Sequence, residues 1–155
     1  GITNRKITAF EPVLIDIGVE VDGYKSDLTR VFFLDRIKPI HRKVYNLVKE
    51  AQSKAIEAIK PGVQIDKIDY ACRNYLKIHG LSKYFGHSTG HGLGLEIHEE
   101  PSISSKNKSL AREGMVFTIE PGVYLPNNFG IRLEDMVYVT KKGVDILSGA
   151  LNKSI

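Results

Sequence analysis

Apolar and turn residues in the first third of the chain predict a β-hairpin. The run Val13-Leu14-Ile15 is short and β-branched, which indicates a largely buried strand. Asp22-Gly23 is a two-residue turn signal, and residues 27–33 resemble the returning strand. A two-residue turn at this point would place Asp16 opposite Thr29.

The next hydrophobic pattern has the period of a helix. Apolar residues recur between residues 44 and 59 at intervals of three and four, which predicts an amphipathic helix. Pro39 suits its first turn, and Pro61-Gly62 would end it. Asp66 is placed to cap a second helix that stops at Gly80.

The remainder of the chain returns to strand patterns after a glycine-rich segment. Residues 86–94 hold too much glycine for a stable helix or strand. Strands are expected at 115–119, 131–133 and 136–140, with a turn at 141–143. Strands, then two helices, then strands predict an α+β fold in which helices cover one face of an antiparallel sheet.

Composition narrows the class of protein. The 155 residues are 42% hydrophobic and 26% charged, which is typical of one compact globular unit. The apolar runs are too short for a membrane span. The net charge of +4 comes from basic residues that do not cluster with aromatic ones, so we expect no nucleic-acid partner. The single cysteine, Cys72, excludes an intrachain disulfide and suggests a reducing, cytoplasmic location.

Four carboxylates lie within or beside apolar strands, where an unpaired charge is costly. They are Asp16, Asp27, Glu120 and Glu134. The hairpin register puts Asp16 and Asp27 on one face. Glu120 and Glu134 would face each other if an odd-length loop centred on residue 127 joins their strands.

Four carboxylates on one face would repel each other unless cations neutralise them. Two divalent cations match the four charges, and the imidazole of His91 would be a fifth ligand. Mixed oxygen and nitrogen ligands suit Mn, Fe, Co or Zn better than Ca. Two such metals can hold a hydroxide between them at neutral pH, which predicts a hydrolase. The segment around His91 matches neither a phosphate-binding loop nor a zincin helix.

Four ordered blocks resemble the M24-type metallopeptidases of the pita-bread fold, the group that holds methionine aminopeptidases, aminopeptidase P and prolidase. Each block is weak alone, but all four in this order are specific. The blocks are Asp16-Ile17-Gly18 with Gly23-Tyr24-Lys25-Ser26-Asp27-Leu28-Thr29-Arg30, Gly90-His91-Gly92-Leu93-Gly94 with Ile97-His98-Glu99-Glu100-Pro101, Thr118-Ile119-Glu120-Pro121-Gly122-Val123-Tyr124, and Gly130-Ile131-Arg132-Leu133-Glu134-Asp135.

The resemblance implies a curved antiparallel sheet covered by helices in an N-terminally truncated chain. Residues 1–155 would form most of a single catalytic domain, without the first part of that domain and without the N-terminal domain. A further active-site histidine is expected at or just ahead of Gly1, since residues 1–12 contain none. The full-length protein is expected to be a homodimer.

The resemblance also implies a role for each matched residue. Asp16 would be a terminal metal ligand, Asp27 and Glu134 would bridge two divalent ions, and His91 and Glu120 would bind one metal. We expect manganese, with Co, Zn or Fe as alternatives.

Three matched residues would be catalytic: His98 would stabilise the tetrahedral intermediate, Glu120 would relay protons, and Arg132 would pair with a carboxylate of the ligand set. The substrate would contact His87, His98 and Tyr124.

The last two blocks resemble the Xaa-Pro branch, because methionine aminopeptidases usually lack Arg132 and Asp135. The expected reaction is hydrolysis of a peptide bond to proline by a metal-bridging hydroxide, in an Xaa-Pro aminopeptidase or an Xaa-Pro dipeptidase. The substrate is therefore a proline-containing peptide. Methionine aminopeptidase is one alternative. A catalytically silent protein-binding module is another, although silent relatives normally lose ligands and all five positions match here.

Overall fold

The computed structural model describes residues 4–155. The first three residues of the expected domain span lie outside this range, as does the histidine position expected at or before Gly1. The described elements are β1 (Pro12–Ile17), β2 (Glu20–Val21), β3 (Tyr24–Lys25), β4 (Leu28–Phe33), α1 (Pro39–Glu57), α2 (Ile65–Ile78), the 3₁₀ helix η1 (Ser82–Tyr84), β5 (Gly90–Gly92), β6 (Glu99–Ile103), β7 (Val116–Ile119), β8 (Gly122–Tyr124), β9 (Gly130–Arg132), β10 (Asp135–Val139) and β11 (Val144–Ile146).

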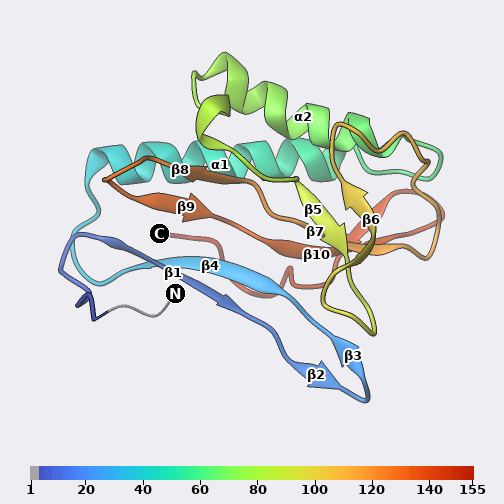
Figure 1. The fold of residues 1–155 in the computed structure, drawn as a ribbon, viewed down its shortest axis with the longest axis horizontal. Helices are drawn as coiled ribbons and strands as arrows, with labels where there is room; N and C mark the ends of the chain where they lie inside the picture. The colour runs from blue at the N-terminus through green and yellow to red at the C-terminus, as the bar shows by residue number, and fades with distance from the viewer. Residues whose placement is uncertain (1–3) are drawn as a thin grey trace.

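A five-stranded antiparallel sheet lies against two helices. Its strand order is β11-β10-β7-β5-β6. Helices α1 and α2 run along the same side of this sheet, while β1 and β4 lie on the other side of β9 and β10 (Figure 1). The predicted α+β class, with helices covering one face of an antiparallel sheet, is confirmed.

The first hairpin has the predicted register. Asp16 pairs with Thr29 in the ladder between β1 and β4, and Val21 pairs with Tyr24 in the ladder between β2 and β3. The turn residues Asp22 and Gly23 have φ angles of 51° and 84°, which a two-residue hairpin turn of type I′ requires.

The second hairpin places Glu120 opposite Glu134. Strands β8 and β9 are joined by the five residues 125–129, and Tyr124 pairs with Gly130. Ile119 pairs with Asp135 in the same register. The two glutamates lie between these ladders and face each other, so the predicted odd-length loop is confirmed.

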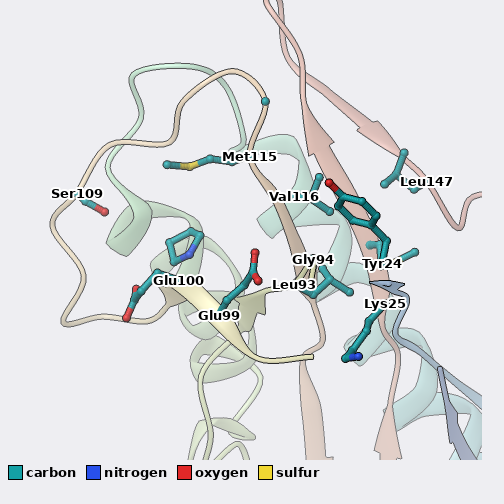
Figure 2. A pocket seen from close by; sticks show the side chains of 13 residues that line it. Tyr24, Lys25, Leu93, Gly94, Glu99, Glu100, Ser109, Met115, Val116 and Leu147 are labelled. Carbon is teal, nitrogen blue, oxygen red and sulfur yellow. The ribbon is translucent and has the colours of Figure 1, made fainter. Parts of the chain in front are cut away.

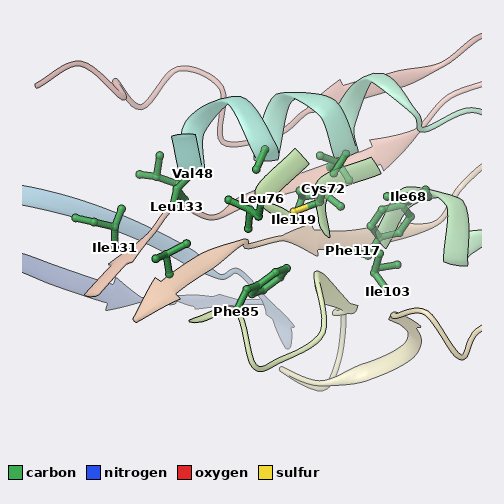
Figure 3. Packing of buried hydrophobic residues seen from close by; sticks show 14 of the residues in the cluster. Val48, Ile68, Cys72, Leu76, Phe85, Ile103, Phe117, Ile119, Ile131 and Leu133 are labelled. Carbon is green, nitrogen blue, oxygen red and sulfur yellow. The ribbon is translucent and has the colours of Figure 1, made fainter. Parts of the chain in front are cut away.

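The main core lies between the helices and the five-stranded sheet. Val48 of α1, Cys72 of α2, and Phe117 and Ile119 of β7 are all fully buried in one hydrophobic cluster, and Figure 3 shows Cys72 beside Ile119. This layer packs against β7, which ends at Ile119, directly before Glu120.

The first strand is less buried than its sequence suggested. Ile15 and Ile17 are 41% and 57% exposed, and Phe32 of β4 is 50% exposed. Together with Leu28 and Leu151 they line an apolar groove of about 450 Å³. The expectation of a largely buried strand was wrong, because no helix in residues 4–155 covers this side of β1 and β4.

The glycine-rich segment contains a strand, contrary to expectation. Residues Gly90–Gly92 form β5, which lies between β6 and β7 in the sheet. A Cβ atom on Gly90 would overlap the carbonyl oxygen of Thr118, and one on Gly92 would overlap that of Glu100. Glycine here permits a close approach of two backbones rather than a loop.

Both helices begin and end close to their predicted limits. Helix α1 begins at Pro39 as expected, and Gly80, with φ of 73°, follows the end of α2. Asp66 is not the cap of α2: Gln64 occupies that position, and Asp66 pairs with Lys108 at 2.5 Å. Among the described residues, neither helix has the length and apolarity needed to cross a membrane.

Candidate metal centre

Three chain segments bring potential metal ligands together. One ligand atom each from Asp27, His91 and Glu134 lies within 4.8 Å of the others. The Nε2 atom of His91 lies 3.6 Å from Oδ2 of Asp27 and 3.4 Å from Oε1 of Glu120. The structure therefore gathers four of the five expected ligand residues into one cluster.

The orientation of His91 follows from its backbone contact. Its Nδ1 atom lies 3.0 Å from the carbonyl oxygen of Gly92. A carbonyl can only accept, so Nδ1 carries a hydrogen, and Nε2, which faces the carboxylates, is the ring nitrogen available to a metal. This is the arrangement in which a neutral histidine binds a metal.

Two threonine hydroxyls fix the glutamates. Thr29 Oγ1 donates to Oε2 of Glu134 at 2.6 Å, and Thr118 Oγ1 donates to Oε1 of Glu120 at 3.2 Å. Thr118 Oγ1 also accepts the backbone N–H of His91 at 3.1 Å. Sequence reasoning missed both threonines, although Thr118 lies two residues before Glu120 and therefore on the same strand face.

The carboxylates of the cluster resist ionisation. Burial, together with the charges of Glu120 and Asp27, raises the pKa of Glu134 from 4.5 to about 8, although the hydrogen bond from Thr29 opposes the shift. Burial and the charge of Asp16 raise the pKa of Asp27, and burial raises that of Glu120. Crowded, buried carboxyl groups of this kind favour a cation between them.

The donor set fits divalent metal ions. Carboxylate oxygens and one imidazole nitrogen converge at separations that ions of this size can bridge. Burial raises the pKa of Glu134 and of Asp27, and a bound cation would favour their ionised forms. These residues can therefore hold one or more divalent cations.

Asp16 lies at the edge of the cluster. Its side chain is 47% exposed and its Oδ2 atom accepts a 2.5 Å hydrogen bond from Arg132. It does not belong to the group within 4.8 Å, but it is close enough for its charge to raise the pKa of Asp27.

A chain of hydrogen bonds connects Asp16 with His87. Arg132 donates to Asp16 and, at 3.0 Å, to the hydroxyl of Tyr124. His87 Nδ1 lies 2.8 Å from the carbonyl oxygen of Ser88 and must donate to it. Its Nε2 atom is then the acceptor for the Tyr124 hydroxyl at 3.1 Å. Burial lowers the pKa of His87, which keeps the ring neutral in this role.

His98 lies beside the cluster on an exposed loop. Its ring centroid is 4.3 Å from that of His91, and its side chain is exposed. Among the expected site residues, Asp16 and His98 are the solvent-facing members. His87, Tyr124 and Arg132 line one side of the site.

A large cavity borders the cluster rather than containing it. It has a volume of about 620 Å³, and its lining contains none of the five expected ligands. Figure 2 shows Tyr24, Met115 and Glu99 around it. Met136 connects the two regions, because it lines the cavity and its Sδ atom lies 3.4 Å from the backbone nitrogen of Asp27.

Comparison with solved structures confirms the expected pita-bread fold. The X-Pro aminopeptidase from Thermotoga maritima superposes with a TM-score of 0.96 at 38% identity, over 99% of this chain and 43% of that chain. The curved antiparallel sheet and its covering helices are therefore shared with that structure.

Comparison with known sequences identifies the family. This chain is 48% identical over 136 residues to the putative dipeptidase YkvY of Bacillus subtilis, which is 88% of this chain and 38% of that protein. It is 41% identical over 141 residues to the Xaa-Pro dipeptidase of Pyrococcus horikoshii, which is 91% of this chain and 40% of that protein. The chain thus spans about 40% of the length of these relatives. Residues 1–141 match the model of metallopeptidase family M24, so the chain belongs to this family.

Proposed function

We propose that residues 1–155 form most of the catalytic domain of a peptidase that cleaves the bond between any residue and proline. We also propose that this domain binds two divalent metal ions and that Mn²⁺ is the preferred metal. The convergence of Asp27, His91 and Glu134 within 4.8 Å carries the proposal. Similarity to proteins named Xaa-Pro dipeptidase and X-Pro aminopeptidase supports the substrate class.

Five residues would hold the metals. Asp27, His91, Glu120 and Glu134 would hold them where their side chains converge, and Asp16 would bind at the edge of the cluster. When bound, two such ions supply Lewis acidity that activates water and polarises the scissile carbonyl.

Glu120 would transfer the proton during hydrolysis. Burial raises the pKa of Glu120, so its carboxyl group can take a proton from the attacking water and deliver it to the leaving nitrogen. The nitrogen of a bond to proline carries no hydrogen and needs this proton as it leaves. His98, beside His91, would donate a hydrogen bond to the oxyanion that develops on the carbonyl.

The substrate would be oriented by the hydrogen-bonded chain of Arg132, Tyr124 and His87. Arg132 also holds Asp16, so binding of the substrate and placement of this ligand are connected through one guanidinium. We further propose a cytoplasmic location, which the single buried thiol of Cys72 supports, and a homodimeric full-length protein.

Hydrolysis assays test the proposal. The full-length protein is stripped with a chelator, reloaded with Mn²⁺, Co²⁺ or Zn²⁺, and given Xaa-Pro dipeptides, Xaa-Pro tripeptides and Met-Ala peptides. We expect Xaa-Pro cleavage that depends on the added metal, and the preference between dipeptide and tripeptide decides between dipeptidase and aminopeptidase.

Two results would contradict the proposal. Cleavage of Met-Ala peptides alone would assign the chain to the methionine aminopeptidases. Two bound metals without turnover of any peptide would favour a protein-binding module.

A further inference from the structure

The sheet has a gap where the two glutamates lie. Leu133 donates its backbone N–H to the carbonyl oxygen of Pro121 at 3.3 Å. In an antiparallel pair of this type the opposite residue returns a hydrogen bond, but Pro121 has no N–H. The carbonyl of Leu133, directly before Glu134, is therefore left without its ladder donor.

Gln52 of α1 supplies the missing donor. Its Nε2 atom donates to the carbonyl oxygen of Leu133 at 3.3 Å and to that of Ile119 at 2.9 Å. These carbonyls belong to the residues that directly precede Glu134 and Glu120. Gln52 is 1% exposed, so one buried amide holds both strands at the point where the ladder is interrupted.

The other end of this amide is fixed by charge. Gln52 Oε1 accepts a 3.1 Å hydrogen bond from Nζ of Lys153, which also binds Asp135 at 2.6 Å. Asp135 is fully buried and pairs with Arg30 at 2.7 Å. Arg30 in turn donates to the carbonyl oxygen of Glu134 at 2.6 Å.

We infer that Gln52 is a positioning residue for the metal centre: it replaces the hydrogen bond that Pro121 cannot donate, and thereby sets the separation of Glu120 and Glu134. A glutamine that only filled space in the core would need neither carbonyl. The inference rests on the proposed function in that the two glutamates bind metal. It assigns a role to α1, which contributes no ligand.

The test pairs Gln52→Met with Pro121→Ala. Methionine has a similar volume but no donor, while alanine at position 121 restores a backbone N–H opposite Leu133. The Mn²⁺ affinity of protein that a chelator has stripped of metal is measured by titration calorimetry. Gln52→Met should weaken binding on the order of tenfold, and the same change in a Pro121→Ala background should weaken it by no more than about twofold. Equal losses in both backgrounds, or no loss in Gln52→Met, would overturn the inference.

Val48→Ala is the matched control. Val48 lies one turn before Gln52 on the buried face of α1, so its truncation weakens the same packing without removing a carbonyl partner. The Val48→Ala variant should unfold at a lower urea concentration, while its Mn²⁺ affinity stays within about twofold of that of the unchanged protein. A comparable affinity loss in Val48→Ala would mean that general destabilisation explains the effect.

Hydrogen–deuterium exchange separates this inference from the proposed function. In metal-free protein, amides of residues 119–120 and 133–135 should exchange faster in Gln52→Met and recover when Pro121→Ala is added. If the unchanged protein binds no Mn²⁺, the proposed function fails, and this exchange pattern alone decides the role of Gln52. Unchanged exchange would refute that role.

Discussion

The hydroxyl of Thr29 donates a 2.6 Å hydrogen bond to Oε2 of Glu134, and the carbonyl oxygen of Thr29 accepts the backbone N–H of Glu134 at 3.2 Å. Residues 105 positions apart in the sequence are thus joined by two hydrogen bonds. Because Thr29 also pairs with Asp16 across the first hairpin, this contact joins the hairpin that carries Asp16 and Asp27 to the segment that carries Glu134.

Glu134→Gln should abolish tight metal binding. The amide keeps the size of the side chain and can still meet the Thr29 hydroxyl, but it cannot provide a negative charge for a bridging position. We expect Mn²⁺ affinity and kcat/KM each to fall by on the order of 100-fold or more, measured by calorimetry and by Xaa-Pro hydrolysis.

Glu57→Gln is the control for that substitution, because Glu57 is an exposed residue at the end of α1. Its metal affinity should match that of the unchanged protein. Retention of full metal affinity by Glu134→Gln would remove Glu134 from the ligand set.

Metal-free protein should lose stability as the pH rises. The pKa of Glu134 is raised from 4.5 to about 8, so folding favours its protonated form. The resulting stabilisation is fully present below pH 4.5 and is lost as the pH rises through 8. Asp27 and Glu120, whose pKa values are also raised, act in the same direction. Urea unfolding between pH 5 and 9 should show a loss of a few kcal/mol.

Metal binding should have the opposite pH dependence. Glu134 must release its proton before it binds a cation, so Mn²⁺ affinity rises with pH and binding releases protons. Calorimetry in buffers of different ionisation enthalpy counts these protons. If the free energy of unfolding of the metal-free protein does not change with pH, and Glu134→Gln gives the same result, the carboxyl group of Glu134 is not buried as described.

Arg132→Lys should impair catalysis although the charge is retained. A lysine ammonium cannot reach Asp16, Tyr124 and Thr29 together as the planar guanidinium does. We expect kcat/KM for Xaa-Pro substrates to fall on the order of 100-fold. Arg42→Lys changes an exposed arginine of α1 in the same way and should have wild-type kinetics, and equal kinetics for both variants would contradict the role of Arg132.

Much of the site could be predicted because its signals are local. The turn at Asp22-Gly23 sets the register that pairs Asp16 with Thr29. Strand alternation places Glu120 opposite Glu134 when the loop between their strands has an odd number of residues. The exposure of Asp16 could not be predicted, because strand alternation places a residue on a face but does not show what covers that face. Gln52 gave no signal either, since a polar residue on a helix is ordinarily assigned to the solvent side.

Backbone contact between strands was also invisible in the sequence. The density of glycine around His91 suggested a loop, whereas Gly90 and Gly92 are there because neighbouring carbonyl groups occupy the space of a side chain. The burial of β1 was overestimated for a related reason: the hydrophobic pattern reports that a face is apolar, but not what covers it.

Gly90→Ala should therefore destabilise the fold. Its Cβ atom would overlap the carbonyl oxygen of Thr118, and β5 cannot move without displacing His91. We expect a loss of about 3 kcal/mol or more in the free energy of unfolding by urea. Gly86→Ala, where no atom lies within 4 Å of the added methyl, should change it by no more than about 0.5 kcal/mol. Similar losses for both would argue that β5 is a loop.

The proposed peptidase activity requires two metal ions bound among Asp16, Asp27, His91, Glu120 and Glu134. The most direct measurement is an anomalous difference map from crystals of the chelated protein soaked in Mn²⁺, recorded at the manganese absorption edge. We predict two peaks, each within coordinating distance of these side chains, with Asp27 and Glu134 contacting both. A map without peaks among these residues, or with manganese bound elsewhere in the chain, would contradict the account.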